Sequence, residues 1–179
     1  MNTPTSYERT PSSSPSVCDH TSVGILVWRG NELLLIERRK FPYGFAPPAG
    51  HVDGDPTFEF AAWRELEEEV GLMATSFRLV AEGDRPNRCR RVNGTWHHWK
   101  VYRAQVEGGQ PVRASIAETK QTGWYTREKL ADLARRTEQY RAGLISEERW
   151  QAAPGLEPVW YDWLTHLGVL AGKEGTRVE

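Results

Sequence analysis

The sequence has few cysteines, no long apolar run and almost no net charge, and each absence narrows what the protein can be. Cys18 and Cys89 are the only cysteines in 179 residues, which is too few for the disulfide framework of a small secreted domain. No apolar stretch approaches the roughly 18 residues that a membrane helix needs. A formal net charge of −1 gives no general attraction to nucleic acid or to a membrane surface. We therefore expect a cytoplasmic protein with no nucleic-acid or membrane partner.

The two ends of the chain differ in composition from its middle. The first 17 residues are rich in Ser, Thr and Pro and lack the apolar segment of a secretory signal, which predicts disorder. The chain is long enough to bury one core without disulfides. We expect residues 1–17 to form a disordered leader and residues 18–138 one folded domain. Residues 139–172 should add a C-terminal helical extension, and residues 173–179 a flexible tail.

Hydrophobic periodicity predicts strands that are interrupted and followed by helices. The expected strands cover residues 23–28, 33–37, 76–85, 95–106 and 122–126. The expected helices cover residues 57–70 and 127–143, with two short helices between residues 146 and 170. Residues 40–56 are dense in Pro and Gly and predict a loop. This order of elements is typical of an α/β layered domain.

Four glutamates crowd into the five positions from Glu65 to Glu69. Like charges one turn apart on a helix repel by about 0.2–0.5 kcal/mol per pair, and Glu65, Glu68 and Glu69 share an arc of roughly 100°. A solvated face is the ordinary explanation of a charge run. No lysine lies between residues 57 and 72 to balance this one. We therefore interpret the three carboxylates as a site for Mg²⁺ or Mn²⁺, hard ions that prefer oxygen ligands.

The same segment resembles the signature of the Nudix hydrolases, G-x5-E-x7-R-E-U-x-E-E-x-G-U, in which U is a large aliphatic residue. Gly50, Arg64-Glu65-Leu66, Glu68-Glu69 and Gly71-Leu72 all stand at the spacing of the family. The resemblance covers roughly residues 23–133. It implies an α/β/α sandwich with a mixed β-sheet between helices. It also implies metal-dependent hydrolysis of a pyrophosphate bond in a nucleoside diphosphate linked to another moiety.

One position of the signature departs from the pattern. The first glutamate of the family would fall at residue 56, where this chain has Pro56, with Asp55 in place of the usual glycine. In the family that glutamate chiefly supports the loop, so the resemblance still implies activity and leaves the number of metal ions open. Pro56 favours a helix start, with either Asp55 or Thr57 as the N-cap.

The resemblance also implies roles for individual residues. Glu68 and Glu69 would be the main metal ligands, Glu65 a ligand or a supporting partner, and the Gly50 carbonyl a further ligand. Arg64 would orient the carboxylates. Glu118 is the only acidic residue in the loop before the last expected strand, which makes it the candidate general base. An ordinary surface glutamate is the alternative.

Substrate contacts are less marked in the sequence. Arg38 and Arg39 follow the second expected strand and could meet phosphates, or they are solvated charges at a strand end. Tyr43 could stack on a base. Pro86 stands fifteen residues past Gly71, as a proline does in some relatives that cleave ADP-ribose. The basic segment around residues 84–99 is either a substrate-facing hairpin or an exposed turn.

Cysteine and histidine suggest a second metal site. Cys18 and His20, together with Cys89 and His97 or His98, offer the ligand types of structural Zn²⁺. A single Cys-x-His lacks the paired spacing of the usual zinc motifs. Buried thiols without a metal are the alternative.

An apolar stripe at helical spacing lies in the expected C-terminal extension. We expect it to pack on the domain, and a homodimer contact is the alternative. The stripe consists of Val159, Trp160, Trp163, Leu164 and Leu167.

Two other functions compete with hydrolysis. A regulatory Nudix domain would bind a nucleotide sugar without cleaving it, but the retained carboxylates favour hydrolysis. An isomerase built on the same fold would need its own catalytic cysteine, and neither Cys18 nor Cys89 stands at a position that suits this role.

Overall fold

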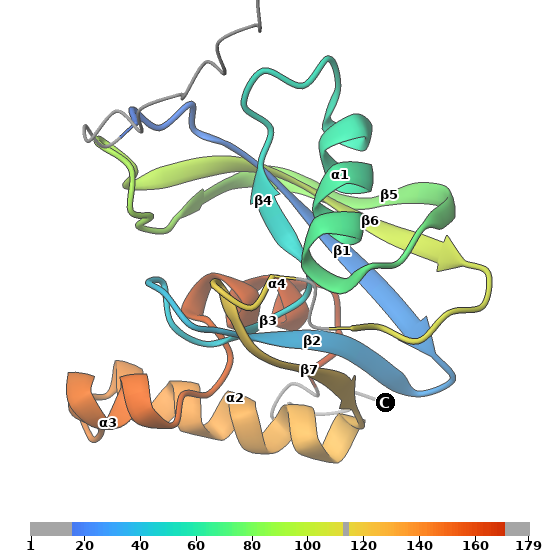
Figure 1. Ribbon diagram of the computed structural model, residues 1–179. Helices are drawn as coiled ribbons and strands as arrows, with labels where there is room; N and C mark the ends of the chain where they lie inside the picture. Colours follow the sequence, from blue (N-terminus) through green and yellow to red (C-terminus); the bar gives the residue numbers. More distant parts are fainter. Residues whose placement is uncertain (1–15, 113–114, 171–179) are drawn as a thin grey trace, which may run out of the picture.

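In a computed structural model of the protein, the described residues are 16–112 and 115–170 (Figure 1). Most of the expected leader and the expected tail lie outside them. No helix in this part of the chain is long and apolar enough to cross a membrane.

The described residues form seven strands and four helices. The strands are β1 (Thr21–Arg29), β2 (Glu32–Arg38), β3 (Phe45–Ala46), β4 (Ala49–His51), β5 (Ala74–Pro86), β6 (Trp96–Val106) and β7 (Thr119–Tyr125). The helices are α1 (Phe58–Val70), α2 (Arg127–Arg141), α3 (Glu147–Ala152) and α4 (Pro158–His166).

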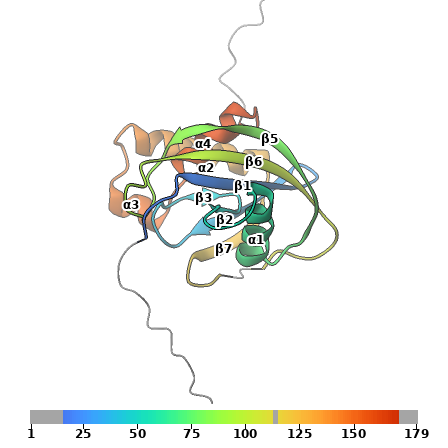
Figure 2. The same cartoon turned by 90° about the horizontal axis from the view of Figure 1, so that it is seen from above.

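Strand β1 lies at the centre of a mixed sheet. It runs parallel to β6 and antiparallel to β2 and β4, while β5 pairs with β6 and β7 with β2. Residues 22–27 of β1 are all buried, as expected for a strand that is covered on both faces. Seen from above, β1 and β6 run between α1 and α4 (Figure 2).

The two faces of the sheet belong to two separate hydrophobic cores. Because side chains alternate along a strand, Val23, Ile25 and Val27 pack with α1 in one core. Leu26 points to the other face, where Trp99 and Trp160 belong to the second core. The structure therefore confirms the expected α/β/α arrangement with a mixed sheet between helices.

Helices α2 and α4 are part of the second core. Trp160 and Trp163 are fully buried, so the apolar stripe packs on the domain. Residues 155–157 also run beside β3, where Phe45 and Leu156 form a parallel bridge. The expected boundary between residues 138 and 139 falls inside α2.

Three short stretches of strand were not expected from the sequence. Strands β3 and β4 lie within the Pro- and Gly-rich segment, where two or three residues are too few to show a period. Strand β7 begins at Thr119 rather than at residue 122. Strand β4 has the larger consequence for function, because its pairing with β1 fixes Gly50 opposite Val23.

Gly24 of β1 lies directly against Trp160 of α4. A Cβ added there would overlap Cη2 of the fully buried Trp160. We expect Gly24→Ala to lower the free energy of unfolding by about 2–3 kcal/mol, because an overpacked core must shift its backbone or its side chains. Gly54→Ala is the control, since nothing lies within 4 Å of the added atom. Urea denaturation of both variants tests this, and equal midpoints would contradict the prediction.

Candidate active site

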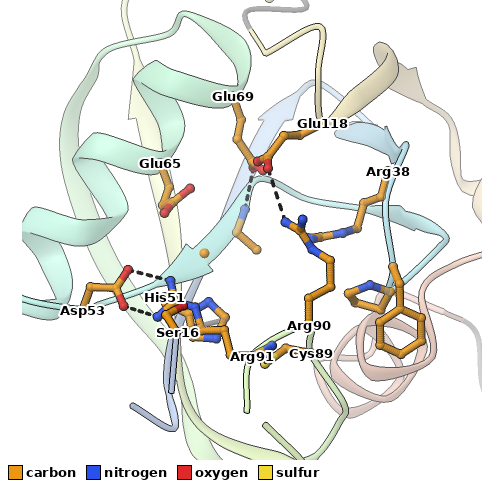
Figure 3. Close-up of a pocket in the computed structure, with 14 residues that line it drawn as sticks. Ser16, Arg38, His51, Asp53, Glu65, Glu69, Cys89, Arg90, Arg91 and Glu118 are labelled. Atoms are coloured by element: carbon orange, nitrogen blue, oxygen red, sulfur yellow. Dashed lines mark hydrogen bonds and ion pairs between the residues drawn. The ribbon is translucent and has the colours of Figure 1, made fainter. Parts of the chain in front are cut away.

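Three of the four predicted metal-binding residues, Gly50, Glu65 and Glu69, border a cavity of about 470 Å³ between α1, β4 and the loop that joins β5 to β6. Figure 3 shows Glu65 and Glu69 projecting from α1 toward this cavity, with Arg90 and Arg38 across from them. The full lining is Ser16, Arg38, Phe41, Pro42, Ala49, Gly50, His51, Asp53, Glu65, Glu69, Cys89, Arg90, Arg91 and Glu118.

Helix α1 begins and ends where its sequence dictates. The side chain of Thr57 caps the N-terminus by accepting a 3.0 Å hydrogen bond from the Phe60 amide, so Thr57 rather than Asp55 is the N-cap. Gly71 ends the helix in the left-handed conformation, with φ at 67°, as a C-terminal glycine commonly does. These two ends set which side of the helix faces β4.

Arg64 joins α1 to the loop before it. Its Nη2 donates to the carbonyl of His51 at 3.0 Å, and its Nη1 donates to Glu65 at 2.7 Å and to Glu68 at 3.1 Å. Its Nε donates to the carboxylate of Asp55 at 2.9 Å. Since a guanidinium is planar and rigid, these bonds hold four groups in one fixed arrangement.

The bond between Arg64 and Asp55 compensates for the absence of a glutamate at residue 56. The chain lacks the glutamate that would support the loop at residue 56, but the carboxylate one residue earlier pairs with Arg64 instead. The loop therefore keeps a supporting carboxylate, and Pro56 is free to set the entry into the helix.

Glu69 is the most deeply buried carboxylate of the site. Its Oε2 accepts a 2.9 Å hydrogen bond from the Ala49 amide. Burial, and after it the neighbouring charge of Glu65, raises the pKa of Glu69 to about 8. Burial also raises the pKa of Glu65, against the pull of Arg64. Two carboxyl groups in this state are poorly stabilised as anions, and a cation placed between them would offset both effects.

Glu65 packs directly on Gly50. A Cβ added at Gly50 would overlap the carboxylate of Glu65, so this position of the carboxylate requires glycine at residue 50. The carboxylates of Glu65 and Glu69 and the Gly50 carbonyl offer only oxygen as ligand atoms. That set fits a hard divalent ion.

Glu68 is placed differently from the other two glutamates of the signature. Its side chain is 60% exposed and is held by Arg64, and it does not line the cavity. Glu67 is exposed, as expected for a solvated residue. The structure thus brings Glu65, Glu69 and Gly50 together at the cavity, whereas Glu68 lines a separate hollow with Trp63 and Glu67.

Glu118 lies at the cavity, just before β7. Its Oε1 is 3.5 Å from Nζ of Lys40 and 3.3 Å from Nη2 of Arg90, and its side chain is 48% exposed. Its charge is one of those that raise the pKa of Glu69. The candidate base is therefore close to the carboxylates and open to water.

Positive charge gathers on the side of the cavity opposite α1. Arg38 pairs with the buried Glu157 at 3.8 Å, and Arg91 makes a two-point ion pair with Asp53. Arg90 has its side chain half exposed. The sequence left open whether the basic segment faces substrate, and the structure places Arg90 and Arg91 in the cavity lining.

Three predicted substrate residues lie outside this cavity. Tyr43 and Pro86 line a neighbouring one of about 470 Å³, which shares Phe41 and Pro42 with the first. Arg39 is exposed, and its Nε donates to the carbonyl of Ile116 at 3.2 Å.

Three of the four residues that were expected as zinc ligands lie together in the structure. Cys18, Cys89 and His97 lie together, but the fourth member of the cluster is His51. The expectation for His20 was wrong, because its ring stacks on Trp96 and its Nδ1 bonds to the Trp96 carbonyl at 2.9 Å. No spacing in the sequence points to His51, which comes close through the pairing of β4 with β1.

These features define a class: an α/β/α domain with a carboxylate-lined cavity faced by arginines. Comparison with known proteins gives the family. The NUDIX domain model matches residues 19–146, and the chain belongs to that family.

Individual relatives match over shorter stretches. The m7GpppN-mRNA hydrolase NUDT17 of Danio rerio is 32% identical over 59% of this chain and 33% of its own length. The ADP-ribose pyrophosphatase of Methanocaldococcus jannaschii is 34% identical over 40% of this chain and 45% of its own. The chain thus spans less than half the length of either. The crystal structure of a MutT NUDIX hydrolase from Burkholderia pseudomallei is 27% identical, with a TM-score of 0.54 over 61% of this chain and 84% of that one.

The ion pair between Arg64 and Asp55 should contribute to stability more than an exposed pair does. Asp55 and Arg64 are 16% and 29% exposed. We expect Asp55→Ala to cost about 1 kcal/mol of unfolding free energy, because it leaves a partly buried guanidinium nitrogen without its acceptor. The control is Asp132→Ala, which breaks an exposed pair with Arg135 and should cost less than about 0.5 kcal/mol. Equal losses in urea denaturation would show that Asp55 does not support the loop.

Proposed function

We propose that this protein hydrolyses a pyrophosphate bond in a nucleoside diphosphate linked to another moiety, such as an ADP-ribose-like compound or a nucleotide or dinucleoside polyphosphate. One observation carries the proposal: Glu65 and Glu69 line the same cavity as Arg38 and Arg90 (Figure 3). Hydrolysis of a pyrophosphate requires positioning and charge neutralisation more than covalent chemistry. A cavity with anionic and cationic linings can supply both.

The carboxylates would hold Mg²⁺ or Mn²⁺. Glu65, Glu69 and the Gly50 carbonyl would provide donors. Glu68, which shares Nη1 of Arg64 with Glu65, is the candidate for a further carboxylate ligand. When bound, such an ion neutralises charge on the pyrophosphate oxygens and favours ionisation of water.

The other residues bind, orient and accept a proton. The guanidinium groups of Arg38, Arg90 and Arg91 would bind phosphate oxygens, which suit their planar donors. Arg64 would keep the carboxylates in place through its four bonds. The carboxylate of Glu118, being half exposed, would accept a proton from the attacking water.

The neighbouring cavity is the proposed site for the nucleoside. It is lined by Tyr43 and Pro86, and also by the stacked pair of Tyr140 and Trp150, whose ring centroids are 4.1 Å apart. Aromatic faces favour a base by stacking. Because this cavity adjoins the first at Phe41 and Pro42, one small molecule could place its base in one and its phosphates in the other.

The rival function is a regulatory domain that binds a nucleotide sugar without cleaving it. The two functions would use the same cavity. The buried carboxylates favour hydrolysis, because burying Glu65 and Glu69 side by side is costly and a bound cation would offset that cost. For the location of the protein we keep the expectation of the cytoplasm.

Glu69→Gln tests the role of the buried carboxylate. We expect kcat/KM to fall by about 10²-fold or more with Mg²⁺, measured by mass spectrometry of the products across a panel of nucleoside diphosphate derivatives. The amide oxygen can still accept the bond from Ala49, so the melting temperature should not fall.

The matched control is Glu67→Gln, which neutralises an exposed residue of the same helix and should keep full activity. A panel on which the unaltered protein cleaves nothing would refute the proposal, and so would Glu69→Gln with unchanged activity.

Glu118→Gln separates a general base from a residue that only positions its neighbours. If Glu118 is the general base, its substitution should lower kcat by about 10²–10⁴-fold and remove the acidic limb of the pH profile. If Glu118 only holds Arg90 and Lys40, KM should rise while kcat and the pH profile stay unchanged. The second outcome would remove Glu118 from the proposed reaction.

A further inference from the structure

Four metal-binding side chains from distant parts of the sequence meet beside the candidate active site. Cys18 precedes β1, His51 ends β4, Cys89 lies in the loop between β5 and β6, and His97 stands near the start of β6. Their sulfur and nitrogen atoms all lie within 4.8 Å of one another. Cys18 and His97 are buried, while His51 and Cys89 are partly exposed. We propose that these four residues bind a structural Zn²⁺ ion.

Four of the six distances between the donor atoms are close to the edges of a tetrahedral zinc site, and none of the six exceeds 4.8 Å. Zn–S bonds of about 2.3 Å and Zn–N bonds of about 2.0–2.1 Å place tetrahedral donors about 3.8 Å apart for two sulfurs, about 3.3 Å for two nitrogens and about 3.5 Å for a mixed pair. The two Sγ atoms are 3.8 Å apart, and the two Nε2 atoms are 3.2 Å apart. Sγ of Cys18 is 3.1 Å from Nε2 of His97 and 3.6 Å from Nε2 of His51.

A backbone amide points at each of the two sulfur atoms. The amide of His20 donates to Sγ of Cys18 at 3.3 Å, and the amide of Arg91 donates to Sγ of Cys89 at 3.4 Å. Such bonds stabilise thiolates. Gly94 leaves room for the second sulfur, because a Cβ there would overlap Sγ of Cys89.

The orientation of the His97 ring is fixed by a hydrogen bond to Asn87. Its Nδ1 lies 3.0 Å from Oδ1 of Asn87, and the same oxygen accepts a 3.1 Å bond from Nε1 of Trp99. Because an indole nitrogen can only donate, this Asn87 atom is an acceptor, and Nδ1 of His97 must carry the proton. Its Nε2 then carries no proton, and its lone pair is available to a metal ion in the cluster. Metal-binding histidines are commonly held in this way.

A disulfide and a hard divalent ion both fit the arrangement less well than zinc does. A disulfide needs its sulfurs about 2.05 Å apart, whereas these are 3.8 Å apart. Thiolates and imidazoles are poor ligands for Mg²⁺ or Mn²⁺ and suit Zn²⁺ in a tetrahedral set. Four protein ligands leave no open position, which is typical of a structural site rather than a catalytic one.

The ion would tie the candidate active site together. His51 follows Gly50 directly, and Cys89 directly precedes Arg90 and Arg91, which line the cavity. Cys18 lies in the segment before β1, and its amide donates to the carbonyl of Val92 at 2.9 Å. One ion would thus hold β4, the loop between β5 and β6, and this segment in register.

The experiment uses the full chain without a histidine tag, expressed in medium that contains zinc. Elemental mass spectrometry should find about one zinc ion per chain. In Cys89→Ser and His51→Ala the content should fall at least about tenfold, because each loses a ligand. His20→Ala is the matched control and should keep its zinc. Glu69→Gln should keep it too, so that loss of hydrolysis and loss of zinc are separate outcomes.

Cobalt substitution of the chelator-treated, unaltered protein gives a second measurement that does not require the variants to fold. We expect the intense visible bands of a tetrahedral Co²⁺ centre, with thiolate-to-metal charge transfer. A protein that holds no zinc, an octahedral cobalt spectrum, a disulfide between Cys18 and Cys89 in the intact mass, or equal zinc in Cys89→Ser would each overturn the proposal.

Discussion

The contact between Glu65 and Gly50 is the constraint on which the candidate active site depends. It brings a carboxylate of α1 against the backbone of β4, and it exists only because Gly50 has no side chain in the way. Arg64 holds the contact from behind, since one guanidinium bonds to Glu65 and to the His51 carbonyl. The pairing of β4 with β1 fixes the other side. Helix, strand and loop therefore reach the cavity as one rigid unit.

The C-terminal segment belongs to this unit more than its position in the sequence indicates. The amide of Glu157 donates to the carbonyl of Phe45 at 2.9 Å, and its buried carboxylate pairs with Arg38 in the cavity lining. Burial raises the pKa of Glu157 to about 7, while Arg38 pulls it down. The close approach of Gly44, where a Cβ would overlap the Glu157 backbone, makes this contact possible. The segment thus helps to place a proposed phosphate-binding residue.

The sequence predicted those parts of the molecule whose signals are local. Helix α1 was expected from its periodicity and its two ends, and Glu65 and Glu69 from their shared face. The three-residue strand β4 left no such signal, and neither did His51, whose neighbours in space are 33 and 46 residues away. Asp55 shows a third case. A motif read position by position records a missing glutamate at residue 56, whereas the structure shows a carboxylate from the adjacent position reaching Arg64.

Strand β4 separates the two proposed metal sites, although they are adjacent in the sequence. Side chains alternate across a strand, so adjacent residues face opposite ways. The Cβ position of Gly50 is directed at Glu65, whereas the ring of His51 turns to Cys18 and His97. The first side offers buried oxygens, which select hard ions, and the second offers sulfur and imidazole nitrogen, which select zinc. Ligand chemistry therefore separates the two proposed sites even though a single peptide bond joins them, and a shift of β4 by one residue would destroy both at once.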